Sequence, residues 1–381
     1  MSDLCSNTIE DVALLAASNY HHRDMKRLLI VSTESHAGKS LLALALGQAI
    51  KDARESITYM KPISSSVCYA TGEPIDRDAQ AISSVLELDA DIKQIAPITL
   101  ETPFLQDAIE SGDHGFRRRI LRSFGETSDN CDVAVIEGRQ YLGLGVATGL
   151  SDFDIAEMLQ ADVVLLTRYD SEAAIDRVLC ALRLIGGESR VLGVILNYVS
   201  METQLNGLTD VFSPFLDERG AEVLGIVPYD HSLHSVCVEE IVEKLGGRVV
   251  TSAPLDGEVR HFRIGATGVE SALRLFRRTP DLGVITGGDR IEIQEAALKA
   301  ARLRCLILTG NHLPQRAIVR KANDRGIPIV VVGQEPMAAA AVCEGLLNQS
   351  RIRPGDRLDR AISLIRSNVD IDRILEKAAD T

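Results

Sequence analysis

Residues 28–40 read Leu-Leu-Ile-Val-Ser-Thr-Glu-Ser-His-Ala-Gly-Lys-Ser, and this stretch decides the fold of everything around it. The four apolar residues at its start are typical of a strand buried on both faces of a parallel sheet. Residues 41–50 are rich in Leu and Ala and predict a helix. Gly38, Lys39 and Ser40 therefore end a tight turn at the N-terminus of that helix. Such a turn gathers backbone N–H groups and the positive end of the helix dipole, so it can hold a phosphate.

This turn is typical of a P-loop, in which Lys39 would reach the outer phosphates and the Ser40 hydroxyl would bind Mg²⁺. The usual P-loop has a Gly five residues before the Gly-Lys pair, where this chain has Thr33. A longer variant has that Gly one residue earlier, where this chain has Ser32. Gly-Lys-Ser alone also occurs at ordinary helix starts. The strand and the helix on either side are what favour a nucleotide site here.

The bulk composition is typical of an α/β protein with a substantial core. The chain has 381 residues, which predicts two or three domains, and 45% of them are hydrophobic. A formal net charge of −13 argues against nucleic acid or an anionic membrane as the main partner. The seven cysteines are scattered singly, as buried thiols are in a reducing cytosol. Residues 1–26 lack the apolar core of a signal peptide, and no apolar run approaches the about 20 residues of a membrane span, so we expect a cytoplasmic protein.

Apolar runs alternate with helical patterns through residues 57–229, which predicts a parallel sheet covered by helices on both faces. The expected strands lie at residues 57–63, 131–138, 163–167, 191–197 and 224–229, with a helix at residues 171–185. Lys61 and Glu137 stand at the carboxyl ends of two of these strands, at the edge where a P-loop lies. A Glu there can complete a magnesium shell. Asp76 and Asp78 precede another helical pattern, either as an N-cap with an acidic first turn or as a carboxylate aimed at the metal.

Six stretches resemble dethiobiotin synthetase and its relatives, in that family's order, over about residues 27–232. They are the nine-residue phosphate loop at residues 32–40, Lys61-Pro62, Asp78-Ala79, Glu137-Gly138, the strand at residues 193–197 that ends in Asn197, and the segment at residues 224–228 that ends in Pro228. The resemblance implies ATP and Mg²⁺ as cofactors. The implied nucleotide contacts are Thr33, Glu34, Ser35, His36, Ala37, Gly38, Lys39, Ser40, Asn197, which would read the adenine, and Pro228. The implied metal ligands are Ser40, Asp78 and Glu137, and the candidate catalytic residues are Lys39 and Lys61.

Two departures from these relatives bear on the substrate. The synthetase has a short Ala-Gly-Gly stretch after Glu-Gly, where this chain has Arg139, Gln140 and Tyr141. Larger side chains there count against diaminopelargonate as the substrate. Glu34 stands where the MinD and ParA relatives have a Lys, which counts against a partitioning ATPase.

From about residue 233 the pattern changes to a second, smaller α/β unit. Residues 282–290 and 305–311 each run from an apolar strand into a Thr-Gly turn, and residues 327–332 form a further strand. Open parallel sheets bind ligands at the carboxyl ends of their strands. A second ligand or an interface is therefore expected at Thr286, Gly287, Gly288, Asp289, Arg290, Thr309, Gly310 and Asn311. Gly287 and Gly288 would leave the backbone uncovered for an anionic group, although Asp289 and Arg290 could equally form an ion pair that closes the turn.

These two turns resemble the DRTGG domain, a small regulatory module also found beside CBS domains. A dethiobiotin-synthetase-like domain followed by a DRTGG domain is the N-terminal arrangement of long phosphotransacetylases, whose acetyltransferase domain we expect to be missing here. The predicted divisions are a polar lead-in at residues 1–26, a P-loop domain at residues 27–232, a DRTGG domain at residues 233–350 and a helical tail at residues 351–381. In the tail, Leu358, Ile362, Ile365 and Val369 recur at helical spacing and would pack on the domain or on a partner. A fragment of about residues 234–381 is expected to fold alone, as a dimer.

The favoured function is an ATP-binding regulatory or assembly protein with weak or gated hydrolysis. By resemblance, its context is acyl-phosphate or acyl-CoA metabolism, and its partners are further copies of itself (a homodimer or higher homo-oligomer) and a separate phosphotransacetylase. An alternative is an ATP-dependent ligase or kinase of the dethiobiotin synthetase type, in which Lys61 would neutralise an acyl-phosphate intermediate. A third is a structural protein with a dead nucleotide site, which Ser32 and Thr33 in place of Gly allow.

Other chemistry-bearing residues have simpler interpretations. His231 and His234 have metal-like spacing, but no third ligand accompanies them. The basic run at residues 117–119 is more typical of a solvated helix face than of phosphate recognition. His21 and His22 lie in the polar lead-in, where a solvated segment is expected rather than a metal pair.

Overall fold

The computed structural model describes residues 25–64, 67–70, 73–100, 105–106, 115–186, 190–200, 207–230, 233, 235–347 and 355–379. The chain divides into two compact units: the described residues up to Asp230 together with those after Arg351, and those between His231 and Ser350. Within this part of the chain, no helix is long and apolar enough to cross a membrane. His21, His22, His231 and His234 lie outside the described residues.

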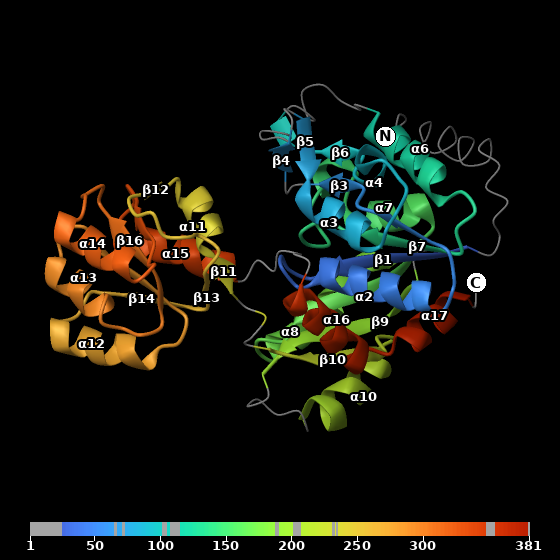
Figure 1. Cartoon of the computed structure of the whole chain (residues 1–381). Helices are drawn as coiled ribbons and strands as arrows, with labels where there is room; N and C mark the ends of the chain where they lie inside the picture. Colours follow the sequence, from blue (N-terminus) through green and yellow to red (C-terminus); the bar gives the residue numbers. More distant parts are fainter. Residues whose placement is uncertain are drawn as a thin grey trace. The chain divides into compact units, whose positions relative to one another are not determined.

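The first unit is built on a parallel sheet with the strand order β10-β9-β8-β1-β7-β2 (Figure 1). Its strands are β1 (Lys26–Ser32), β2 (Ile57–Met60), β7 (Val133–Glu137), β8 (Asp162–Arg168), β9 (Val191–Val199) and β10 (Val223–Pro228). The order reverses at β1, because β7 and β2 lie on one side of it and β8, β9 and β10 on the other. Open sheets bind ligands at such a reversal, in the crevice at the carboxyl ends of the strands. That crevice is where the loop after β1 begins.

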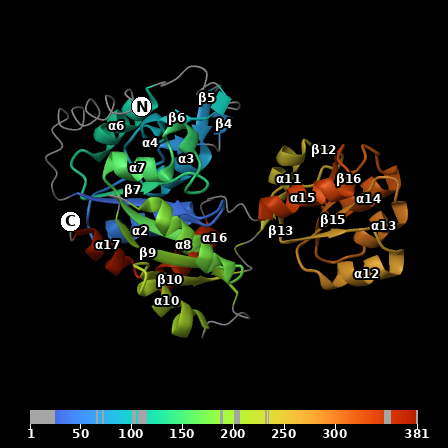
Figure 2. The same ribbon diagram turned by 180° about the vertical axis from the view of Figure 1, so that it is seen from behind.

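Helices cover both faces of this sheet, which confirms the predicted α/β class (Figure 2). Successive residues of β1 point to opposite faces, so Leu28 and Ile30 belong to one core and Leu29 and Val31 to the other. The helices of the first face are α2 (Lys39–Asp52), α3 (Arg77–Val85), α16 (Asp356–Asn368) and α17 (Ile371–Ala379). Those of the second face are α6 (Phe116–Ser128), α7 (Asp152–Leu159), α8 (Ala173–Ile185) and α10 (Ser213–Asp217).

The strand expected at residues 57–63 is shorter than predicted. β2 ends at Met60, and Pro62, which has no N–H for a sheet ladder, separates it from the next strand. That strand, β3 (Ile63–Ser64), pairs instead with β6 (Ile98–Thr99). The remaining short elements of the first unit are the antiparallel pair β4 (Val67–Ala70) and β5 (Glu73–Asp76), helix α4 (Ile92–Ile95), and the single turns η1 (Val146–Thr148) and η2 (Leu208–Phe212).

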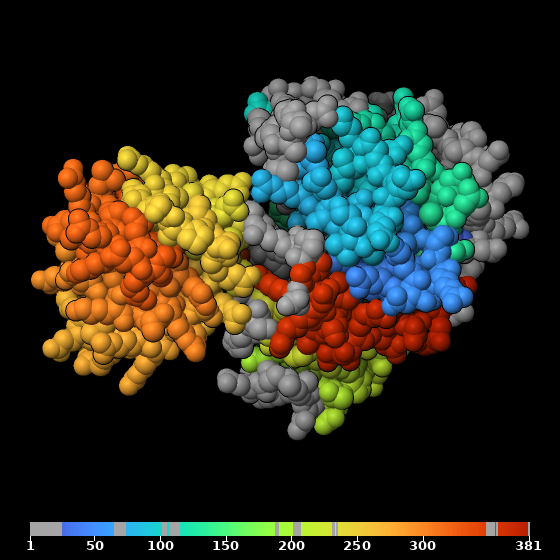
Figure 3. Space-filling model, in the orientation of Figure 1, coloured from blue at the N-terminus to red at the C-terminus, as the bar shows by residue number. Residues whose placement is uncertain are grey.

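The C-terminal helices complete the first unit rather than the second. Figure 3 shows α16 and α17, in red, lying along the blue α2. The apolar stripe predicted in the tail is buried in the same core as α2: Leu358, Ile362, Ile365, Val369, Ile371, Ile374 and Ala378. Between the helices, Val369 bridges to Gly225 of β10, where a Cβ would stand 2.7 Å from the carbonyl oxygen of Asn368. Lys377 of α17 forms an ion pair with Glu222 at 2.7 Å.

The second unit is therefore inserted between the body of the first unit and its last two helices. Its sheet has the order β12-β17-β16-β15-β14, in which only β12 runs antiparallel to its neighbour among the described strands. Its elements are β11 (Val236–Cys237), α11 (Val238–Leu245), β12 (Arg248–Val249), β13 (Glu258–Val259), β14 (His261–Ile264), α12 (Val269–Arg278), β15 (Leu282–Gly287), α13 (Ile291–Ala297), β16 (Leu303–Thr309), α14 (Arg316–Asp324), β17 (Ile329–Val331) and α15 (Pro336–Leu347). A fragment of residues 234–381 would separate α16 and α17 from the core in which they are buried. The fragment expected to fold alone should therefore end at about residue 350, where the predicted DRTGG domain ends.

This packing predicts that a core substitution in the tail destabilises the P-loop unit. Ile374 has no exposed surface, so Ile374→Ala should lower the free energy of unfolding by about 2–5 kcal/mol. Glu376→Ala, on the exposed face of the same helix, should change it by less than about 0.5 kcal/mol. Hydrogen exchange read by mass spectrometry should show faster exchange in β9 and β10 and no change in β15 and β16. Faster exchange in β15 and β16 instead would show that the tail packs on the second unit and would contradict this assignment.

Candidate functional site

The turn that begins α2 requires Gly at position 38. Gly38 has a φ of 103°, and a Cβ on it would stand 2.5 Å from Nδ2 of Asn197. Asn197, near the end of β9, donates from that Nδ2 to the carbonyl oxygen of Ala37 at 2.7 Å. Its Oδ1 accepts the N–H of Tyr198 at 2.8 Å. Asn197 therefore braces the phosphate loop, and its predicted contact with adenine remains a prediction.

Lys39 is buried at the centre of this loop, with 7% of its surface exposed. Its ammonium donates to the hydroxyl of Ser32 at 2.7 Å and to the carbonyl oxygen of Gln140 at 3.1 Å. Burial lowers the pKa of Lys39, and the charges of Asp152 and Glu137 oppose that effect without cancelling it. The protein alone thus leaves this positive charge under-compensated, which favours an anion beside it.

Glu137, at the end of β7, connects the helix of the phosphate loop to the neighbouring strand β2. Its two carboxylate oxygens accept the hydroxyls of Ser40 at 2.7 Å and of Tyr59 at 2.8 Å. Neighbouring ligands in the octahedral shell of Mg²⁺ are about 2.9 Å apart, because each Mg–O distance is about 2.0–2.1 Å. The spacing of the Ser40 and Glu137 oxygens therefore fits two adjacent magnesium ligands, and the ion usually takes its others from phosphate and water.

Lys61 lies on the other side of Glu137, among three carboxylates. Its ammonium is 2.9 Å from Asp76, 3.7 Å from Glu137 and 3.9 Å from Asp78. Burial alone would lower the pKa of Lys61, but Glu137, Asp76 and Asp78 outweigh it and raise that pKa. Asp76 also caps α3 by accepting the N–H of Ala79 at 2.8 Å. The N-cap interpretation of this acidic pair thus describes Asp76, and the more exposed Asp78 remains a metal ligand only by prediction.

Within the described residues, no three His, Cys, Asp or Glu side chains lie in an arrangement that could hold a metal ion by themselves. A magnesium ion would therefore depend on the Ser40 hydroxyl and on phosphate oxygens as well as on carboxylates. That is the ordinary mode of binding for Mg²⁺ beside a nucleotide.

The other predicted loop residues fall into two groups. Glu34 is already paired with other protein groups. Its carboxylate accepts the N–H of Arg168 and forms an ion pair with Arg177 at 2.9 Å. This pairing gives a physical reason for an acid where some relatives have a Lys. Ser35 is half-buried and His36 is exposed, with a left-handed φ of 58°. Pro228 ends β10, at the same edge of the sheet.

Asp152 is a site residue that the sequence analysis did not identify. It begins α7 and is completely buried beneath the Glu137-Gly138 segment. Its Oδ1 accepts the N–H of Arg139 at 2.7 Å, and a Cβ on Gly138 would stand 2.6 Å from its Oδ2, which has no hydrogen-bond partner among the described residues. Burial raises the pKa of Asp152 to about 7, against the opposing effects of the Arg139 N–H and Lys39. Its only sequence signal was the Ser151-x-x-Asp154 cap beside it, which predicts a helix start and nothing more.

In the second unit, the two Thr-Gly turns are locked to each other. Thr309 donates from its hydroxyl to the carbonyl oxygen of Thr286 at 3.3 Å, and Arg290 donates to the carbonyl oxygen of Gly265 at 2.7 Å. Gly288 is buried, and a Cβ on it would stand 2.4 Å from the carbonyl oxygen of His312. The expectation that Gly288 leaves the backbone uncovered is therefore wrong, because chain from the neighbouring turn fills that space. Ligand binding at these turns remains a prediction.

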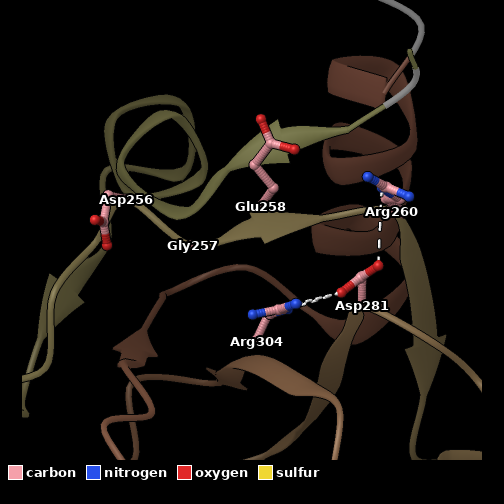
Figure 4. Close-up of a pocket in the computed structure, with 6 residues that line it drawn as sticks. All are labelled: Asp256, Gly257, Glu258, Arg260, Asp281 and Arg304. Atoms are coloured by element: carbon pink, nitrogen blue, oxygen red, sulfur yellow. Dashed lines mark hydrogen bonds and ion pairs between the residues drawn. The ribbon is translucent and has the colours of Figure 1, made fainter. Parts of the chain in front are cut away.

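The second unit also has a cavity of about 400 Å³, at the opposite edge of its sheet (Figure 4). It is lined by Asp256, Gly257, Glu258, Arg260, Asp281 and Arg304. Asp281 pairs with Arg304 at 2.6 Å and with Arg260 at 3.8 Å, so its two arginines are already partly neutralised. The lining carries three acids and two arginines, which gives it no excess of positive charge for an anion.

The buried carboxylate of Asp152 predicts a specific pH dependence of stability. A folded pKa of about 7 against an unfolded value of 3.8 means that the folded state holds this proton more tightly. The contribution of Asp152 to the free energy of unfolding should therefore fall as pH rises from about 4 to about 7, by up to about 1.4 kcal/mol per pH unit. Asp152→Asn should lose this slope in urea unfolding without metal or nucleotide, whereas the exposed control Asp176→Asn should keep it. Parallel curves for wild type and Asp152→Asn would contradict the assignment.

Curated relatives of the chain fall into two groups. It is 27% identical over 377 residues to the phosphate acetyltransferase of Synechocystis sp., and this match covers 91% of this chain and 51% of that protein. It is 24% identical over 365 residues to the phosphate acetyltransferase of Pseudomonas putida, with coverages of 91% and 51%. It is 20% identical over 203 residues to the ATP-dependent dethiobiotin synthetase BioD of Methanococcus vannielii, with coverages of 52% and 92%. The chain thus spans about half the length of the phosphate acetyltransferases that it matches.

The solved structures that match parts of the chain include the following three. Cobyrinic acid a,c-diamide synthase from Mycobacterium smegmatis, with bound ADP and magnesium, is 15% identical, covers 54% of this chain and 88% of its own, and has a TM-score of 0.36. The MinD cell division protein of Aquifex aeolicus is 17% identical, with coverages of 54% and 83% and a TM-score of 0.31. The CBS and DRTGG domains of the Clostridium perfringens pyrophosphatase are 17% identical, with coverages of 43% and 78% and a TM-score of 0.25.

Family models match each unit separately. Residues 26–236 match the model of an AAA domain, and residues 240–346 match the model of the DRTGG domain. The predicted resemblance, a dethiobiotin-synthetase-like P-loop region followed by a DRTGG region as in phosphotransacetylases, is confirmed by these matches and by the relatives. The chain therefore belongs to the AAA domain family through its first unit and carries a DRTGG domain as its second.

Proposed function

We propose that this protein binds ATP with Mg²⁺ at the phosphate loop of its first unit and acts as a regulatory or assembly protein with weak or gated hydrolysis. The observation that carries the proposal is the convergence of Lys39, Ser40 and Glu137 at the N-terminus of α2. Lys39 would hold the outer phosphates, and Ser40, Asp78 and Glu137 would hold the metal, which neutralises phosphate charge. The relatives of about twice this length are phosphate acetyltransferases, so the proposed context is acyl-phosphate or acyl-CoA metabolism.

Gating is proposed because the loop after Glu137 is bonded to the same lysine that would hold the phosphates. Lys39 and Ser32 both donate to the carbonyl oxygen of Gln140, and Leu142 donates its N–H to the carbonyl oxygen of Ser32 at 2.9 Å. A phosphate that draws the ammonium of Lys39 toward itself weakens one of these bonds. Nucleotide would then change the position of residues 139–149, and the DRTGG unit would sense a second small ligand or mediate assembly into a homo-oligomer.

A second candidate is an ATP-dependent ligase of the dethiobiotin synthetase type, which the burial of Lys61 at the same edge favours. Phosphate release separates the candidates. Slow release with ATP alone supports the regulatory proposal, release only with an added carboxylate supports the ligase, and no ATP binding at all supports a dead site.

The first test concerns the phosphate loop. ATP with Mg²⁺ at a hundredfold excess over Kd should stabilise the wild type by about 2.7 kcal/mol. Lys39→Ala should abolish the rise in melting temperature, because the buried ammonium that pairs with the phosphates is gone. Lys51→Ala, at the far end of the same helix, should keep it. Equal shifts in wild type and Lys39→Ala would disprove the site.

The second test concerns the metal. Glu137→Gln retains the shape and one acceptor oxygen for the hydroxyls of Ser40 and Tyr59 but lacks the negative charge that Mg²⁺ prefers. Calorimetry should show that Mg²⁺ no longer tightens ATP binding, whereas the exposed control Glu157→Gln behaves as wild type. If Mg²⁺ tightens ATP equally in Glu137→Gln, this carboxylate has a structural role only.

A further inference from the structure

Three side chains form a continuous stack at the carboxyl ends of β8, β9 and β10. The guanidinium carbon of Arg168 lies 4.5 Å from the ring centroid of Tyr198. The rings of Tyr198 and Tyr229 are 6.1 Å apart and inclined at 48°. All three residues are partly exposed, although aromatic residues account for only 4% of this chain.

The stack begins beside the phosphate loop. The hydroxyl of Tyr198 is 3.9 Å from the position that a Cβ on Gly38 would occupy. From β1 the sheet continues through β8 and β9 to β10, so the three residues stand at the ends of successive strands, on the side of β1 away from β7. Lys61, Asp76 and Glu137 lie on the opposite side of the loop, toward β7 and β2. A ligand whose phosphates sit in the loop can therefore extend over the stack without meeting these carboxylates.

The backbone of Tyr198 is held in a conformation that is unfavourable for a bulky residue. Tyr198 has a left-handed φ of 61°, which is uncommon for a bulky residue and persists where the surroundings impose it. Asn197 imposes it here by accepting the N–H of Tyr198 while donating to Ala37 of the phosphate loop. Arg168 is fixed to the same loop, because its N–H donates to the carboxylate of Glu34. The loop and the stack are thus one connected structure.

We propose that Arg168, Tyr198 and Tyr229 form a stacking shelf for the base of the nucleotide and that Tyr198 is the main residue that selects a purine. This inference rests on the proposed function, since it concerns the nucleotide bound at the phosphate loop. Aromatic rings and guanidinium planes both stack on bases, and the larger π face of a purine gains more from such contact. The shelf supplies affinity for the base, whereas hydrogen bonds at its edge would distinguish adenine from guanine.

The test compares ligands with and without a base. Binding of Mg·ATP, Mg·UTP and magnesium tripolyphosphate is measured by competition against a fluorescent ATP analogue. Loss of one base stack corresponds to about a 5- to 150-fold weakening, so Tyr198→Leu should weaken ATP binding by that factor. It should reduce the preference for ATP over UTP and leave the affinity for tripolyphosphate unchanged. Tyr198→Phe, which keeps the ring, should retain the affinity and the preference of the wild type.

A matched control removes an arginine–aromatic contact elsewhere in the same unit. Arg219 lies 3.6 Å over the ring of Phe215 on α10, before the amino end of β10. Phe215→Leu should leave both affinities and the ATP preference unchanged, with folding monitored by circular dichroism.

The outcomes separate the proposed nucleotide binding at the phosphate loop from the proposed stacking shelf. If the wild type binds neither ATP nor tripolyphosphate, the proposed function fails. If it binds both and Tyr198→Leu weakens both equally, or neither, the loop binds phosphate but the shelf is wrong. If only ATP binds the wild type, the base supplies nearly all of the affinity, and Tyr198→Leu must then abolish binding or the shelf is again wrong.

Discussion

The buried carboxylate of Glu137 is the constraint on which the first unit's site depends. An ion in a protein interior costs several kcal/mol unless it is paired and hydrogen-bonded. Glu137 is only 4% exposed, and its oxygens are satisfied by hydroxyls from two different elements, Ser40 of α2 and Tyr59 of β2. β7 must therefore lie between β1, which leads into the phosphate loop, and β2, which leads to Lys61. The strand order of the sheet and the chemistry of its edge are two consequences of the same requirement.

The chain order adds a second constraint, because the last two helices of the first unit follow the second unit in sequence. Gly225 of β10 packs against Val369, and Arg366 of α16 pairs with Asp52 at the end of α2. The helix that carries the phosphate loop is thus covered by residues that follow the DRTGG unit in sequence. Closing so long an excursion costs little more than closing a short one, since loop entropy grows only with the logarithm of length.

Sequence patterns located most of the fold but only part of the site. The strand and helix around residues 28–52 were predictable because burial on both faces and helix periodicity are local signals. The stripe in the tail predicted a helix, yet nothing local could say which unit it covers. Asp152 and Tyr198 were missed for the same reason: a cap residue and a strand-end aromatic become site residues only through the distant chain that they meet. Gly138 was identified within a motif, but the reason that this position needs a glycine is a tertiary contact. The carboxylate of Asp152 lies against its backbone and leaves no room for a Cβ.

The two buried lysines of the site differ in a way that bears on its chemistry. Both are almost fully enclosed, at 7% and 8% exposure, so burial penalises both charges to a similar degree. Three carboxylates reverse that penalty at Lys61, and its pKa is raised, whereas the pKa of Lys39 stays lowered. An incoming anion therefore gains most beside Lys39, where its charge replaces compensation that the protein does not supply. Beside Lys61 it would have to displace Asp76 or Glu137 and leave that carboxylate buried without its cation. This imbalance favours binding of nucleotide phosphates beside Lys39 over binding of a second anion beside Lys61.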